Sequence, residues 1–275
     1  MRFRYVRGQV LVGADGARPG DGDTVRLVEP TLYDGEGAVV PFHFRHLSRA
    51  TDSLAVRLLG VDTPEETYAG SPLPGHGMPN LATLAPRPPQ QEPWAGRAKH
   101  FTDQFLSAAG RGERVTVELD QQLFDRFGRV LGYLYLGEDP TPDRHLNLQL
   151  LAAGWATLYQ VHPNLLHLDE FGRAVESARA AGRGLWPDLE DQRVLGVDEI
   201  RQRRALNPPF VYRKVIDASI AGVSVEEAFR LTGRWVGNRQ SRQVFPPAAW
   251  ASVPHALRVF FDQPTPIQAL GYRRV

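Results

Sequence analysis

Alternating apolar and polar residues in the first two-thirds of the chain predict short strands interrupted by helices. Strands are predicted at residues 9–12, 24–28, 54–59, 114–119 and 130–136. Apolar residues at helical spacing predict helices at residues 94–106, 146–153 and 168–181. The pattern is therefore that of an α+β domain of about five strands and three helices, which would fit an OB-type β-barrel.

Two stretches break this pattern and read as insertions, near residues 29–52 and 66–93. The first holds apolar runs around Tyr33–Gly37, which predicts a long hairpin with a Gly-rich tip. The second is rich in Pro and Gly without an apolar period, so we expect a long loop. It follows the acidic segment at Asp62 directly, and we expect it to gate a cleft there. His76 lies within this insertion, and we interpret it as a residue without a functional role rather than as a metal ligand.

Acidic residues gather in two of the turns that these strands predict. Asp21 and Asp23 flank Gly22, and Asp62 and Glu65 follow the strand at 54–59. Hard divalent cations prefer carboxylate and carbonyl oxygens as ligands. A further carboxylate near such a cation could orient or deprotonate a water molecule. Together these residue types suit metal-assisted cleavage of a phosphodiester.

Two arginines, Arg57 and Arg129, accompany the acids. A guanidinium can hold the nonbridging oxygens of a phosphate bidentately while negative charge builds up on them. Each signal also has a plainer interpretation. Asp21-Gly22-Asp23 alone is typical of a turn, and residues 125–129 could form a solvated hairpin with a surface ion pair. The functional interpretation depends on the segments occurring together.

In their order along the chain, these segments resemble the staphylococcal-nuclease-like (thermonuclease) family. The resemblance covers about residues 5–187 and rests on the segments Asp21–Val25, Arg57–Glu65, Asp125–Arg129, Gly154–Tyr159 and Gly184–Pro187. It implies an OB-type five-stranded barrel that hydrolyses DNA and RNA with calcium. It also implies a catalytic domain over residues 1–190 that contains both insertions.

The resemblance carries roles to individual positions. Asp23, Asp62 and the backbone carbonyl of Thr63 match the family's cation ligands, and Asp21 matches an acid just outside them. The catalytic residues implied are Arg57, Glu65 and Arg129, with Glu65 as general base and the arginines as phosphate clamps. The substrate-binding residues implied are Arg126, Phe127 and Tyr159.

The sequence departs from the family pattern at the clamp turn. Arg126 and Phe127 stand where the family archetype has a lysine and a tyrosine. Arg126 keeps a cation for the phosphate backbone, but Phe127 keeps only a ring and lacks a hydroxyl donor. We therefore expect Phe127 to stack on a base without hydrogen bonding. The stretch from Gly154 to Pro163 is one residue shorter than in the archetype.

The composition of the chain excludes some kinds of site and shows how charge is distributed. The chain of 275 residues has no cysteine, which excludes disulfides and thiolate metal sites. We see neither a membrane span nor a secretory signal, so we expect a cytoplasmic protein. The net charge of the whole chain is +1, but charge is unevenly distributed along the sequence. Residues 1–195 hold 20 Lys and Arg against 25 Asp and Glu, whereas residues 196–275 hold 12 against 6.

The basic C-terminal part has no resemblance that we can assign. We expect a charged linker at 191–207 and a small, basic, α-rich module at 208–275. A capping box at Ser224–Glu227 predicts a helix that ends near Gly233. Aromatic residues such as Trp235 and Trp250 alternate with arginines there, so they could stack on bases or form the core of a small domain.

The sequence thus predicts a calcium-dependent nuclease acting on single-stranded or frayed DNA and RNA, whose C-terminal module holds substrate near the cleft. The alternative, of another class, is an inactive nucleic-acid or protein binding module of the same fold. Inactive relatives usually lose carboxylates or clamp arginines, and none is lost here. Neither membrane nor protein partner is indicated by the sequence.

Overall fold

The computed structural model describes residues 3–11, 21–41, 52–76, 90–108, 114–262 and 267–275. Its larger sheet is built from β1 (Phe3–Val10), β2 (Thr24–Asp34), β3 (Val39–Val40), β4 (Leu54–Leu58), β6 (Arg114–Phe124) and β7 (Val130–Leu136). The order is β1-β6-β7-β4-β2-β3, and β1 also pairs with β2. Five strands therefore pair in a closed ring, to which β3 adds as a hairpin partner of β2.

Most neighbours in this ring are antiparallel, but β4 and β7 run parallel, with Val56 opposite Val130. Three helices accompany the sheet: α1 (Trp94–Ser107), α2 (Leu146–Ala152) and α3 (Leu168–Ala180). The predicted α+β class is confirmed. The predicted strand at 130–136 and the three helices lie within one residue of their observed bounds, because a continuous apolar run marks the strand and apolar residues at helical spacing mark the helices.

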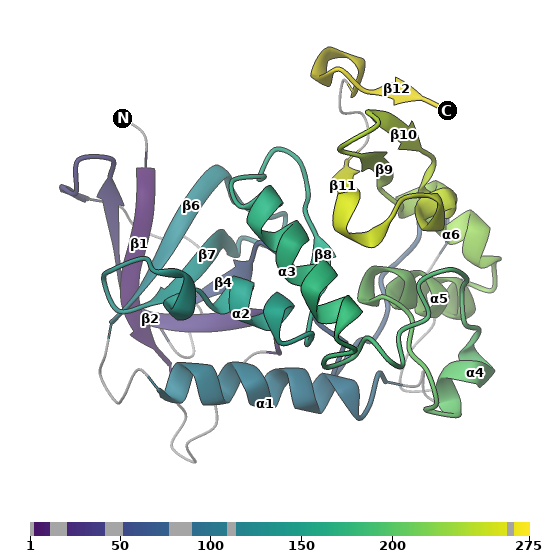
Figure 1. Cartoon of the computed structure of the whole chain (residues 1–275), viewed down its shortest axis with the longest axis horizontal. Coiled ribbons are helices and arrows are strands. Elements are labelled where there is room, and N and C mark those ends of the chain that lie inside the picture. Colours follow the sequence, from purple (N-terminus) through teal and green to yellow (C-terminus); the bar gives the residue numbers. More distant parts are fainter. Residues whose placement is uncertain (1–2, 12–20, 42–51, 77–89, 109–113, 263–266) are drawn as a thin grey trace.

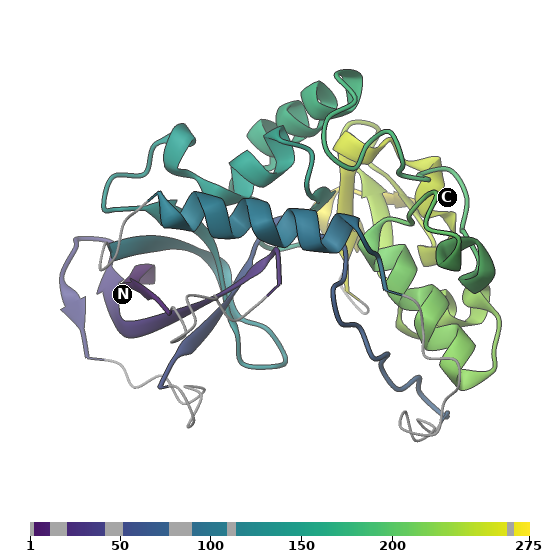
Figure 2. The ribbon, with the colours of Figure 1, turned by 90° about the horizontal axis from the view of Figure 1, so that it is seen from below.

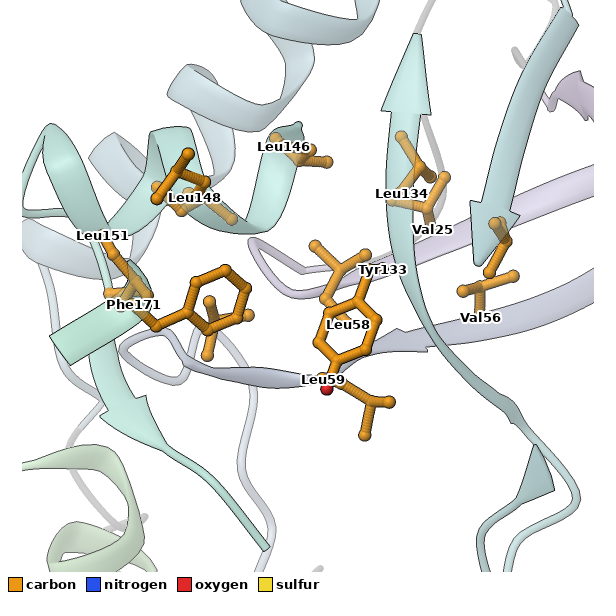
Figure 3. Packing of buried hydrophobic residues seen from close by; sticks show 14 of the residues in the cluster. Val25, Val56, Leu58, Leu59, Tyr133, Leu134, Leu146, Leu148, Leu151 and Phe171 are labelled. Carbon is orange, nitrogen blue, oxygen red and sulfur yellow. The ribbon is translucent and has the colours of Figure 1, made fainter. Parts of the chain in front are cut away.

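The core of this part lies between the strands and α2 and α3. Side chains from β4 and β7 meet Leu146, Leu148 and Leu151 of α2 and Phe171 of α3 (Figure 3). All four of these residues are buried. Burial of each such side chain contributes roughly 1.5–3 kcal/mol, so this packing holds the strand ends in place.

A sharp turn separates β4 from the short strand β5 (Gly60–Asp62), which pairs with β8 (Thr157–Tyr159). Gly60 has φ +76°, and a Cβ there would lie 2.5 Å from the ring of Phe171. Only glycine fits, since both the dihedral and the space exclude a side chain. Buried Asn147 secures the turn by donating to the Leu59 carbonyl at 2.8 Å and accepting from Leu134 N–H at 2.9 Å.

The C-terminal part contains α4 (Val197–Arg201), α5 (Pro209–Ala221) and α6 (Val225–Thr232), followed by a sheet. That sheet has the order β11-β9-β10-β12 and comprises β9 (Trp235–Asn238), β10 (Gln243–Phe245), β11 (Arg258–Phe261) and β12 (Arg273–Arg274). Short 3-10 segments lie at Pro142–Arg144, Pro247–Ser252, His255–Leu257 and Ile267–Leu270. The prediction of an α-rich module was wrong in leaving out this sheet, whose strands are too short to show an apolar period.

Two further C-terminal expectations can be compared with the structure. The segment expected to be a linker contains α4, whose Ile200 is buried, and it ends at the fully buried Asn207. Trp250 is also buried, against Phe210. The sequence allowed the aromatic residues either to stack on bases or to form a core. Trp250 belongs to the core. No helix in the described ranges is both long and apolar enough to cross a membrane.

The two parts of the chain lie side by side, with the ringed sheet on one side and α4, α5, α6 and β9–β12 on the other (Figures 1 and 2). Residues after β8 pair with β11: Phe260 N–H donates to the Gln160 carbonyl at 2.8 Å, and His162 N–H donates to the Phe260 carbonyl at 2.9 Å. Within the second insertion, Tyr68 and Ser71 both donate to buried Asp217 of α5 at 2.7 Å. These bonds fix the C-terminal part against the end of β5.

His255 of the C-terminal part also contacts the N-terminal part, because its Nε2 lies 3.0 Å from the backbone nitrogen of Leu158 in β8. Burial, with nearby Arg258, holds the pKa of His255 well below its ordinary 6.5. Burial, with nearby His167, lowers the pKa of His145 to about 3. Both rings are therefore neutral in the folded protein at neutral pH.

We expect the free energy of unfolding to fall as the pH drops below 6.5. The unfolded chain then binds protons at His255 and His145 that the folded protein rejects, which costs roughly 1.4 kcal/mol per pH unit for each histidine. Urea unfolding between about pH 5 and 7 measures this slope. His255→Gln should lower this slope by about one bound proton, because the substitution removes one of the two histidines that the folded protein keeps neutral. Equal slopes in His255→Gln and the wild type would contradict the assignment.

Candidate active site

The pairing of β2 with β4 brings the first acidic turn to the arginine that sequence analysis singled out. Thr24 lies opposite Arg57, and Leu58 N–H donates to the Asp23 carbonyl at 2.9 Å. The turn at Leu59 and Gly60 then directs β5, whose last residue is Asp62, back toward the same point. Strand register and a glycine turn thus place Asp23, Arg57 and Asp62 together.

Asp23 and Asp62 are 2% and 0% exposed, and one guanidinium joins them. Arg57 Nη1 pairs with Asp23 Oδ1, and Arg57 Nη2 lies 2.9 Å from Asp62 Oδ1. The other oxygen of Asp23 accepts from Thr63 N–H at 3.1 Å. The two buried carboxylates therefore share the guanidinium of Arg57.

This donor set fits a hard divalent cation. Carboxylates that already share one cationic group can share a metal ion, which prefers such oxygens. In addition, Thr63 Oγ1 and Asp21 Oδ1 are buried without a hydrogen-bond partner among the described residues. Polar atoms left unpaired in this way are candidates for an ion or its water ligands. The unpaired oxygens of Thr63 and Asp21 thus support a cation site among these residues, whichever hard divalent cation binds there.

Glu65 lies beyond this pair and is held by Gln91, whose side-chain oxygen accepts from Glu65 N–H at 3.0 Å. Burial raises the pKa of the Glu65 carboxyl above its ordinary 4.5, and the charge of Asp62 adds to the increase. The guanidinium of Arg213 opposes both, since its Nη1 lies 2.5 Å from Glu65 Oε1. A carboxylate with a raised pKa is suited to accepting a proton.

Arg129 reaches the edge of this group from the turn between β6 and β7. Its Nε donates to Asp125 Oδ2 at 2.7 Å, and its Nη1 lies 3.4 Å from Thr24 Oγ1. Thr24 in turn lies 3.4 Å from Asp23 Oδ1. The surface ion pair considered for this hairpin is thus present, and it holds Arg129 beside the carboxylates.

Phe127, in the same turn, is 65% exposed, and the guanidinium of Arg126 lies 4.8 Å from the centre of its ring. Large exposed rings next to cations are suited to stacking on bases. These two residues stand at the rim rather than among the carboxylates, as a role in substrate binding requires.

Tyr159 lies on β8 opposite Gly60, so β5 and β8 bring it to the same region as Asp62. Its hydroxyl accepts from Arg234 Nη1 at 2.7 Å. The Tyr159 ring packs against Phe210 and Phe260 of the C-terminal part. Tyr159, which was expected to bind substrate, is therefore partnered by residues of the C-terminal part.

Arg213 and Arg234 are the residues of this region that sequence analysis missed. Arg213 belongs to α5 and lies 151 positions from Asp62 in sequence, yet it contacts both oxygens of that carboxylate. Arg234 precedes β9. Arg234 belongs to the stretch of alternating arginines and aromatic residues for which nucleic-acid binding was considered, but nothing in that pattern places it beside Tyr159, and Arg213 belongs to no motif.

A second group of metal-ligating types occurs at His145, His167 and Glu170, whose candidate ligand atoms lie within 4.8 Å of one another. His167 Nε2 is already 3.0 Å from Glu118 Oε2 and 3.2 Å from the Tyr135 hydroxyl. The histidine rings also stack within a cluster that includes Phe171. His145 is buried, whereas His167 and Glu170 are partly exposed, and none of the three was a predicted ligand.

Comparison with known proteins identifies the class of domain. The family model of staphylococcal nuclease homologues matches residues 55–188. This segment is therefore a domain of that family, and the match does not extend into the C-terminal part.

Individual relatives are similar to different shares of the chain. Thermonucleases of Staphylococcus hyicus and Staphylococcus intermedius are 28% and 32% identical over 48% and 45% of this chain. Endonuclease YhcR of Bacillus subtilis strain 168 is 22% identical over 92% of it. The matched regions cover 62%, 55% and 16% of those three proteins, respectively. The chain thus spans less than two-thirds of each relative.

Proposed function

We propose that this protein is a calcium-dependent nuclease that hydrolyses phosphodiester bonds of DNA, RNA or both. The observation that carries the proposal is the convergence of buried Asp23 and Asp62 on Arg57, with Glu65 at the edge of the same group. Endonuclease and thermonuclease relatives support it, as does the family domain at 55–188. The closed ring of five strand pairings supports an OB-type barrel as the scaffold.

Asp23, Asp62 and the Thr63 carbonyl would hold the cation, with Asp21 just outside them. When bound, a calcium ion would neutralise charge on the phosphate and favour ionisation of a nearby water molecule. This choice among hard cations follows the family, whose members are generally metal-dependent. Other oxygen-binding ions can occupy such donor sets.

The protein's own residues would carry the remaining steps. Glu65 would accept a proton from the attacking water, whose oxygen forms the new bond to phosphorus as the bond to the leaving oxygen breaks. Arg57 and Arg129 would hold the nonbridging oxygens, where negative charge increases in the transition state. Arg126 and Phe127, at the exposed turn, would bind the neighbouring backbone and base, with Tyr159 on the opposite side.

The alternative function is a binding module that does not turn over, and one observation favours it. Arg213 occupies both oxygens of Asp62 and contacts Glu65, so it competes with a cation for the same carboxylate. Were this ion pair permanent, the domain would bind nucleic acid without cutting it.

Incubation of the purified protein with denatured DNA, in calcium or in chelator, separates the two functions. The nuclease is expected to release short products in calcium and none in chelator. Binding in both conditions, without products in either, would instead establish the binding module. Single-stranded DNA and RNA of matched sequence then show which sugar is preferred.

A further inference from the structure

Helix α5 brings a third guanidinium into the group of carboxylates. Arg213 Nη1 and Nη2 lie 3.0 and 2.9 Å from the two oxygens of Asp62, and Nη1 also contacts Glu65. The Arg213 side chain is 20% exposed. Arg213 thus belongs to the site by geometry, and part of it remains open to solvent.

A second arginine of the C-terminal part, Arg234, also lies beside Tyr159. Arg234 donates to the Tyr159 hydroxyl at 2.7 Å, and its guanidinium carbon lies 5.6 Å from the centre of the ring. The corresponding distance for Arg213 is 5.8 Å. One tyrosine therefore connects two arginines, and both come from the part of the chain outside the matched family domain.

The charges at this place favour an anion once a divalent cation is bound. Asp23, Asp62 and Glu65 supply three negative charges, and Arg57 and Arg213 supply two positive ones. A doubly charged cation would leave this group with a net positive charge. Arg234 has a 58% exposed partner, Asp262, and ion pairs so open to water are weak and readily exchanged.

We propose that Arg213 and Arg234, together with the Tyr159 hydroxyl, form a subsite for a backbone phosphate of the nucleic-acid strand, next to the phosphate that is cleaved. Guanidinium groups bind phosphate bidentately, and a phenol hydroxyl adds a single hydrogen bond. The nuclease site is then completed by the C-terminal part, which contributes these two residues. This inference rests on the proposed function, because it names the substrate group that the same site holds.

The test is binding of a short single-stranded DNA with phosphorothioate linkages, which keep the negative charge and resist hydrolysis, measured by calorimetry in calcium. Arg234→Gln and Arg213→Gln are each expected to weaken binding about tenfold. Each should also reduce the slope of log affinity against log salt by roughly 0.7, the value for one lost contact to a single strand. Arg230→Gln is the matched control, since that arginine pairs with Glu227 on α6 and should change neither quantity.

Loss of Arg213 removes a charge between two carboxylates, so folding is checked by thermal unfolding. Arg213→Lys provides a second variant that keeps the charge but loses the fork, and it should recover only part of the affinity. The Arg234→Gln variant loses an ion pair with Asp262, which is 58% exposed, so its unfolding midpoint should equal that of the wild type. If a folded Arg234→Gln protein binds with unchanged affinity and salt slope, the subsite is overturned. Calcium-dependent cleavage by the wild type, measured alongside, keeps that failure separate from failure of the nuclease function.

Discussion

An Arg57→Ala variant is expected to hydrolyse denatured DNA about 10²–10³-fold more slowly than the wild type. Arg57 joins the two carboxylates that are proposed to bind the cation, Asp23 and Asp62. Its removal takes away a preorganised donor that would stabilise charge on the phosphate in the transition state. Initial rates over a range of DNA concentrations give kcat/KM and measure the loss.

The matched control is Arg7→Ala. Arg7 also lies on the ringed sheet, but it pairs with Glu138, which is 58% exposed. We expect this variant to keep wild-type kcat/KM. Near wild-type activity in a folded Arg57→Ala protein would remove Arg57 from the mechanism, whatever happens in the control.

A Glu65→Gln variant is expected to lose about 10²–10⁴ in kcat with little change in KM, because general-base catalysis is removed and substrate contacts are kept. Glutamine preserves the volume of the side chain and an oxygen that can accept from Arg213. Single-turnover hydrolysis separates the chemical step from binding and product release.

Glu66→Gln serves as the control for this prediction, since the adjacent glutamate has no role in the proposed site. It should cleave at the wild-type rate. A Glu65→Gln enzyme that is equally fast would show that another group, or water alone, takes the proton.

The N-terminal part was predictable because local pattern and chemistry agree there. The continuous apolar run of β7 and the helical spacing of apolar residues in α1 predicted those elements closely. The grouping of Asp23, Arg57 and Asp62 followed from the order of short motifs, and the structure brings these residues together through the β2–β4 pairing and the Gly60 turn. Their chemical roles remain proposals.

The rest depends on contacts between residues far apart in sequence. Arg213 stands in a helix whose own pattern indicates burial rather than chemistry, and only packing of α5 against the end of β5 places it on Asp62. The second insertion was expected to gate the cleft. Among its described residues, 66–76 and 90–93, Tyr68 and Ser71 are bound to Asp217 of the same helix. Residues 77–89 lie outside the described part of the chain.

These contacts distinguish the C-terminal part from a basic module that is merely tethered to the nuclease-like domain. A basic module attached by a linker would only raise the local concentration of substrate. The observed arrangement, with β11 paired to residues after β8 and Arg213 on Asp62, makes it part of the wall of the site. Deleting it would therefore alter the site itself.

The central claim is that Asp62 and its neighbours hold a cation that is needed for cleavage. The most direct measurement is the rate of hydrolysis of denatured DNA as calcium is titrated from excess chelator upward, for the wild type and for Asp62→Asn. The wild-type rate should rise from none in chelator to a plateau, whereas Asp62→Asn should require far more calcium or release no product. Equal wild-type rates in chelator and in calcium, or an unchanged calcium requirement in Asp62→Asn, would contradict it.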